Sequence, residues 1–133
     1  MCDTVRQGVM SQVLWYWLPV ALYAGTIFYL SSQSHPEEQL PSLMFEEVSD
    51  KVLHAVEYAI LGALCYRAFR WGVSGQIASQ SLLFAVVTAS LYGMTDEGHQ
   101  FFVPFRESSW QDWVADTAGA VIGAMSWRAI RPG

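Results

Sequence analysis

Two polar runs stand inside otherwise apolar stretches of this chain, and both contain side chains that can bind ions or move protons. The first extends from Asp50 to Tyr58 and contains a lysine, a histidine and a glutamate. The second lies between Asp96 and Asp116. Its side chains of interest are Asp96, Glu97, His99, Gln100, Arg106, Asp112 and Asp116. A charged group inside an apolar spanning helix is costly, so these runs indicate a functional site.

The first run has helical spacing. Lys51, His54, Glu57, Tyr58 and Leu61 follow one another at steps of three and four residues, which places them on one helix face. A buried carboxylate such as Glu57 needs a partner or a proton. His54 and Glu57 could pair with each other, or supply two metal ligands as Glu-x-x-His pairs do in bundles. A lone histidine such as His54 is more often a helix-packing residue than a ligand.

The ends of two predicted helices carry charges that oppose the helix dipole. Lys51 begins one helix, where a cation is mildly unfavourable, and Asp96 and Glu97 end the next, where carboxylates are unfavourable. Both ends lie on the same side, so we expect an ion pair between Lys51 and these acids. The alternatives are that Lys51 reaches the lipid headgroups and that the two acids are solvated.

Two acids near the start of the last predicted helix have different explanations: Asp112 belongs to a helix cap, whereas Asp116 does not. Ser109 and Asp112 fit the S-x-x-D capping pattern, whereas Asp116 lies four residues, about 6 Å, deeper on the same face. Gly119 and Gly123 continue this face with the GxxxG spacing that permits close helix approach. Asp116 should therefore point into a bundle. The expected neighbours of Asp116 are His54, Glu57, Lys51 and Arg106.

Arg106 offers a planar pair of donors that suits a carboxylate or a phosphate. It either binds a ligand or holds its own loop on Asp96, Glu97 or Asp112. The ligand-binding candidates are Lys51, His54, Glu57, Tyr58, Asp96, Glu97, Gln100, Arg106, Asp112 and Asp116. Among them, His54, Glu97 and Asp116 are the catalytic candidates.

The elements that carry these residues are predicted to be membrane-spanning helices. The chain of 133 residues is 53% hydrophobic and 14% charged, whereas soluble domains are nearer a quarter charged. A span needs about 20 apolar residues, and four windows qualify: about 13–31, 50–69, 77–95 and 112–130. The prediction is one all-α domain, residues 1–133, forming a four-helix membrane bundle without a soluble catalytic domain. A compact soluble four-helix protein and a signal peptide cleaved near Ala24 are the alternatives.

Basic residues set the predicted orientation. Five of the seven lie on one side of four spans, and only Lys51 and Arg106 on the other; both termini are thus expected in the cytoplasm and the polar runs outside it. The absence of a basic patch in the sequence argues against nucleic-acid binding. Cys2 and Cys65 have no CxxC spacing, so they do not indicate a metal or redox motif.

The motifs also resemble a known family. The run Leu30-Ser31-Ser32-Gln33-Ser34 is similar to the start of a VanZ-like domain, and Asp50-Lys51-xx-His54-xxx-Tyr58-xx-Leu61-Gly62 resembles its second-helix motif. Asp96-Glu97-xx-Gln100-xxx-Pro104-x-Arg106, followed by Asp112, Asp116, Gly119 and Gly123, resembles its C-terminal signature. The resemblance covers about 25–124. Two positions depart from it: Phe105 stands where the family often has Gly, and Asp116 where it often has Asn.

The resemblance implies a bacterial integral membrane protein of the cell envelope, associated with low-level resistance to the glycopeptide teicoplanin. Asp116 in place of Asn favours a charged or proton-carrying role.

Three hypotheses remain open from the residues. The polar cluster binds an anionic or polar envelope ligand, such as a lipid-linked precursor or a phospholipid headgroup, with Lys51 and Arg106 on the anion. Alternatively, carboxylates and His54 hold a divalent cation for metal-assisted or acid–base catalysis. Third, the cluster only locks a structural bundle, which could form homo-oligomers through Gly119 and Gly123.

Overall fold

The computed structural model describes the backbone of residues 2–33, 46–106 and 108–133, and these ranges contain helices joined by turns and short irregular segments, with no strand. The helices are α1 (Cys2–Ser31), α2 (Glu46–Trp71), α3 (Gly75–Ser79), α4 (Ser81–Gln100) and α5 (Trp110–Ile130). The connection expected between the first two predicted spans, 13–31 and 50–69, lies partly outside the described residues, which omit 34–45. The expectation of an all-α protein is confirmed for the part of the chain that the structure describes.

Two of these helices are long and apolar enough to cross a membrane: Val5–Ser31 and Asp50–Trp71. The windows predicted at 13–31, 50–69 and 112–130 lie within α1, α2 and α5. The window at 77–95 is not one helix, because Gln80, with φ −106° and ψ 26°, separates α3 from α4. The finding supports a helical membrane protein, and the four-span arrangement stays a prediction.

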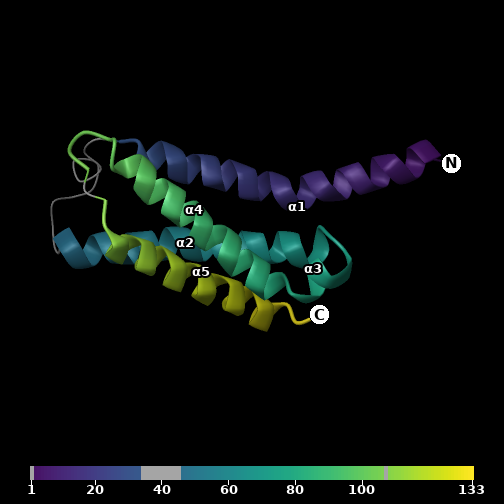
Figure 1. Cartoon of the computed structure of the whole chain (residues 1–133). Helices are drawn as coiled ribbons and strands as arrows, with labels where there is room; N and C mark the ends of the chain where they lie inside the picture. Colours follow the sequence, from purple (N-terminus) through teal and green to yellow (C-terminus); the bar gives the residue numbers. More distant parts are fainter. Residues whose placement is uncertain (1, 34–45, 107) are drawn as a thin grey trace.

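The centre of the fold is α2, which packs along α5, α4 and α1 (Figure 1). The contact with α5 is closest where glycine replaces a side chain. A Cβ at Gly123 would lie 1.8 Å from the carbonyl oxygen of Ala59, and one at Gly119 would lie 2.1 Å from that of Ala55. The close approach predicted from GxxxG is therefore made within the chain, and α2 occupies this face. A homo-oligomer would need a different surface.

Large apolar side chains face outward along the helices. Trp15 and Leu22 of α1 are 69% and 65% exposed, and Leu83 of α4 and Ile122 of α5 are 59% and 62% exposed. Large apolar side chains exposed on several helices are expected of a protein that contacts lipid or a partner. The interior is by contrast narrow, since Ala85, Ala89, Ala120 and Ala124 are fully buried. Small residues at helix contacts are typical of membrane bundles.

Candidate functional site

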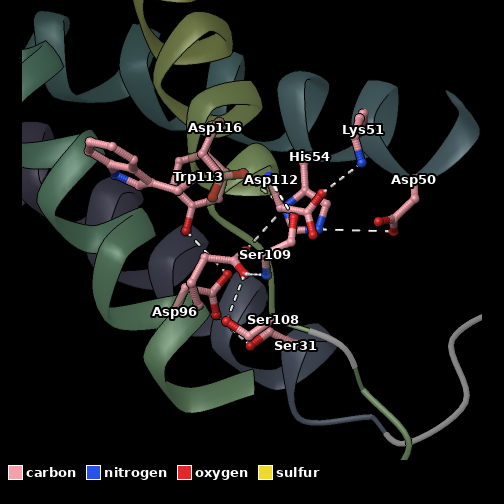
Figure 2. Close-up of polar contacts among 12 residues, drawn as sticks. Ser31, Asp50, Lys51, His54, Asp96, Ser108, Ser109, Asp112, Trp113 and Asp116 are labelled. Atoms are coloured by element: carbon pink, nitrogen blue, oxygen red, sulfur yellow. Dashed lines mark hydrogen bonds and ion pairs between the residues drawn. The ribbon is translucent and has the colours of Figure 1, made fainter. Parts of the chain in front are cut away.

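Polar side chains from four helices meet at one end of the bundle, where α1 and α4 end and α2 and α5 begin (Figure 1). Figure 2 shows how these side chains point toward one another from the separate helices. The buried polar residues at this end are Ser31, His54, Asp96, Glu97, Gln100, Asp112 and Asp116. We call this set the polar cluster. Six of its seven members, all but Ser31, were among the sequence-predicted candidates.

The centre of the polar cluster is a histidine–aspartate pair. The Nδ1 atom of His54 lies 2.8 Å from Oδ1 of Asp116, and the two residues are 5% and 0% exposed. An ionised carboxylate only accepts hydrogen bonds, so Nδ1–H of His54 donates to it. The other ring nitrogen, Nε2, lies 4.0 Å from Oδ1 of Asp50, a residue with a side chain 49% exposed. Asp116 thus orients the ring with Nε2 toward the open side of the cluster.

Asp96 is held by hydroxyl groups. It accepts hydrogen bonds from Oγ of Ser31 and, at 3.2 Å, from the hydroxyl of Tyr58. Ser31 ends α1, so this contact ties the first helix to α4. Ser31 is not among the predicted site residues, although it lies in the Leu30–Ser34 run that carries the family resemblance.

Glu97 has one satisfied and one unsatisfied oxygen. Its Oε2 accepts from the backbone N–H of Ser109 at 3.1 Å and from Oγ of Ser108 at 3.3 Å. Its Oε1 is buried without a hydrogen-bond partner in the described residues, 3.9 Å from Nδ1 of His54. Glu97 lies beyond the predicted span 77–95, and burial raises its pKa to about 7 against the opposing effects of the Ser109 N–H and His54.

The start of α5 confirms the predicted cap and changes one predicted pairing. Oγ of Ser109 accepts from the backbone N–H of Asp112 at 3.1 Å, as the S-x-x-D pattern requires. The side chain of Asp112 instead pairs with Lys51, with Nζ 3.4 Å from Oδ1. The prediction that Lys51 pairs with Asp96 or Glu97 is therefore wrong. The first turns of α2 and α5 lie side by side, whereas the two α4 acids turn toward α1 and the α5 cap.

Three predicted residues contribute less directly. Gln100 is 1% exposed, and its Oε1 finds no hydrogen-bond partner among the described residues. Glu57 and Arg106 are half-buried, and neither side chain forms a hydrogen bond or ion pair with another described residue. His99 faces α1, where its ring stacks on Phe28 with centroids 4.5 Å apart.

The polar cluster has the donor atoms of a cation site. One ligand atom each from His54, Glu97 and Asp116 lies within 4.8 Å of the others, and all three residues are buried. A second set, Asp50, His54 and Asp112, meets the same distance criterion, but Asp112 is already paired with Lys51. In the first set Oε1 of Glu97 and Oδ2 of Asp116 are buried without hydrogen-bond partners in the described residues. Carboxylate oxygens with one imidazole suit a divalent cation such as Zn²⁺ or Mn²⁺.

Comparison with known families identifies the chain. A family model described as VanZ/LLP1 matches residues 8–131. The chain belongs to the VanZ/LLP1 family. No curated protein and no solved structure was found to match it. The matched region of this VanZ/LLP1 chain includes every residue of the polar cluster, so the cluster lies within the family domain.

The two departures from the VanZ-like pattern now have structural meaning. Phe105, where Gly is frequent, has a φ of 62°, so this loop keeps the left-handed backbone that glycine adopts most easily. Asp116, where Asn is frequent, gives His54 a carboxylate partner. The cluster of this VanZ/LLP1 chain is accordingly one carboxylate more acidic than the common pattern implies.

Proposed function

We propose that this VanZ/LLP1 chain is a multi-pass membrane protein of the bacterial cell envelope that binds a divalent cation between His54, Glu97 and Asp116. Through that cation it holds the polar headgroup of an envelope lipid. One observation carries the proposal: two buried carboxylate oxygens, on Glu97 and Asp116, lack hydrogen-bond partners in the described residues beside an imidazole. A buried carboxylate without a partner is unfavourable, and a cation supplies the missing contacts. A cation bound through Nδ1 of His54, the nitrogen that faces Asp116 and Glu97, would take the place of the proton there.

The charges of the polar cluster favour a cation over direct binding of an anion. Asp96, Glu97 and Asp116 are 4%, 6% and 0% exposed, and a bare anion placed among them would be repelled. Lys51, which the sequence suggested as an anion contact, is already paired with Asp112. A phosphate or carboxylate of a headgroup could instead share the cation. Arg106, half-buried at the same end, would contact the headgroup from the rim.

The cation is tested by metal analysis of the purified, detergent-solubilised protein. Titration with Mn²⁺ and Zn²⁺ should give about one tightly bound ion per chain. Glu97→Gln and Asp116→Asn, which keep shape and remove charge, should each weaken binding at least about tenfold, since loss of even an outer-shell partner of a metal ligand costs about that much. Glu57→Gln is the matched control, because Glu57 is a half-buried acid outside both candidate sets. Equal weakening in the control, or no binding to the wild type, would reject the cation site.

The lipid component has its own test. Phospholipids and lipid-linked precursors that remain with the purified protein should be quantified by mass spectrometry, before and after treatment with a chelator. Loss of a headgroup class on chelation, and its return on adding the cation, would support binding through the metal. Retention that is independent of chelator would reject the role of the cation while leaving lipid binding intact.

The resistance implied by the family name can be measured in cells. Wild type, Glu97→Gln and Asp116→Asn should be expressed in a bacterial host, with membrane abundance and teicoplanin susceptibility determined together and vancomycin as comparison. Variants that keep wild-type abundance and lose protection would support a working site. Joint loss of abundance and protection would favour the structural-bundle hypothesis, since buried polar networks also stabilise folds.

A second function, acid–base catalysis, is favoured by one observation. Asp116 holds Nδ1 of His54, and Nε2 lies toward the open side of the cluster, 4.0 Å from Oδ1 of the half-exposed Asp50. An oriented imidazole of this kind can serve as a general base. Turnover of a lipid-linked substrate that resists chelator and is abolished by His54→Gln would favour this function over the cation-dependent one.

A further inference from the structure

A cavity opens at the end of the bundle opposite the polar cluster. Trp71, which lines it, lies 17 residues beyond His54 along α2, or roughly 25 Å at the helical rise. The cavity has a volume of about 560 Å³ and is lined by aromatic and basic residues, a size typical of small-ligand sites. The lining residues that matter here are Trp15, Tyr16, Arg67, Trp71, Trp127 and Arg131. We call it the basic cavity.

Arg67 is built into the wall of the basic cavity. Its guanidinium carbon lies 4.7 Å from the ring centroid of Tyr16 and 5.7 Å from that of Trp15. Its Nη1 donates to the backbone oxygen of Trp15 at 3.3 Å. An arginine whose only role was to set the orientation of the helices across a membrane would extend into solvent. Arg67 is instead half-buried and stacked on aromatic rings. Stacking fixes the plane of the guanidinium and leaves other N–H groups for a ligand.

The chemistry of the lining favours an anion. The side chains that line the cavity include two arginines and no acid, and neither Arg67 nor Arg131 forms an ion pair with a described acidic side chain. The terminal residue Gly133 also lines the cavity, and its oxygen accepts from Nη2 of Arg70 at 2.6 Å. The buried Nε1–H of Trp127 finds no acceptor among the described residues. A second cavity of about 480 Å³ adjoins it through Pro132 and Gly133 and is likewise free of acids. Arginine and tryptophan donors without an acidic side chain match a phosphate, which only accepts hydrogen bonds when ionised.

The level of the basic cavity matches that of lipid headgroups. It lies at the end of the candidate span Asp50–Trp71, and Trp15 beside it is 69% exposed. Tryptophan and arginine at a span end are typical of the membrane–water interface. Basic pockets between helices at this level bind the headgroups of anionic lipids.

We propose that the basic cavity binds the phosphate of an anionic phospholipid headgroup, with Arg67 and Arg131 as the charged contacts. Arg67 presents its fixed plane to the phosphate, and the aromatic rings contact the glycerol and the upper acyl chain. This site is separate from the polar cluster and does not depend on the cation proposed there.

The test is lipid binding by the full-length protein in detergent. Short-chain phosphatidylglycerol and phosphatidylcholine should be titrated while the fluorescence of the cavity tryptophans is followed, and lipid retention should be measured by native mass spectrometry. Wild type should bind phosphatidylglycerol at least about tenfold more tightly than phosphatidylcholine. The double variant Arg67→Gln/Arg131→Gln should lose this preference. Arg67→Lys, which keeps the charge and loses the stacked plane, should retain only part of it.

Arg6→Gln is the matched control, because Arg6 is exposed on α1 outside the cavity; it should leave the preference unchanged. An equal loss in Arg6→Gln would overturn the proposal in favour of general surface charge. Inorganic phosphate that competes as well as the lipid would overturn the assignment to a lipid. Circular dichroism and the metal content of the double variant should match wild type, which separates failure of this site from failure of the fold or of the cation site.

Discussion

Replacing Gly123 with alanine should separate α2 from α5. A Cβ at this position would lie 1.8 Å from the carbonyl oxygen of Ala59, whereas real Cβ contacts essentially never fall below 3.0 Å. The two helices must therefore move apart locally by at least about 1.2 Å, the difference between these two distances. The obstructing atom belongs to the backbone, so no side-chain rotation can relieve the overlap.

The energetic balance of Gly123→Ala can be estimated. Overpacking of a close contact costs about 1–3 kcal/mol, and the rigid neighbour places this site toward the upper end. Alanine gains back about 1 kcal/mol of helix propensity over glycine. We expect a net loss of about 1–2 kcal/mol in the free energy of unfolding. Because α2 and α5 also carry His54 and Asp116, their 2.8 Å contact should lengthen and cation binding should weaken with it.

The assay is equilibrium unfolding in mixed micelles of mild detergent and sodium dodecyl sulfate, followed by circular dichroism. Gly25→Ala is the matched control, since Gly25 is helical and a Cβ added there would meet no neighbouring atom within 4 Å; it should be neutral or stabilise by up to about 1 kcal/mol. If Gly123→Ala raised the unfolding midpoint as Gly25→Ala does, the close approach of α2 and α5 would be refuted.

Two further predictions concern residues beside the polar cluster. Ser109→Ala removes the cap of α5 and should cost about 1 kcal/mol of unfolding free energy, measured in the same assay. The control is Ser79→Ala, because Ser79 is exposed and its hydroxyl donates within its own turn; this change should cost less. Equal losses would argue against a capping role for Ser109. Arg106→Ala should reduce the amount of co-purifying envelope lipid at unchanged abundance, and lipid retention equal to wild type would remove Arg106 from the headgroup site.

The sequence by itself determined most of the helices, although not the break at Gln80 within the window 77–95, and most of the chemistry. Long apolar runs require helices in a membrane because backbone groups must be satisfied within the segment. The steps of three and four placed Lys51, His54 and Tyr58 on one face, and S-x-x-D marked the cap at Ser109. The GxxxG spacing of Gly119 and Gly123 indicated a close contact. Each of these features depends only on local geometry, which is why spacing alone could find it.

Only the tertiary structure decided which groups meet. Lys51 pairs with Asp112 and not with the α4 acids, because the relative rotation and depth of two helices fix their contacts and neither is encoded in the spacing along one helix. Ser31 joined the cluster through a hydroxyl contact to Asp96 across 65 residues of sequence. The basic cavity depends on the same effect, since Arg67 acquires its position from rings on α1. Long-range packing selects among the pairings that local sequence leaves equally favourable.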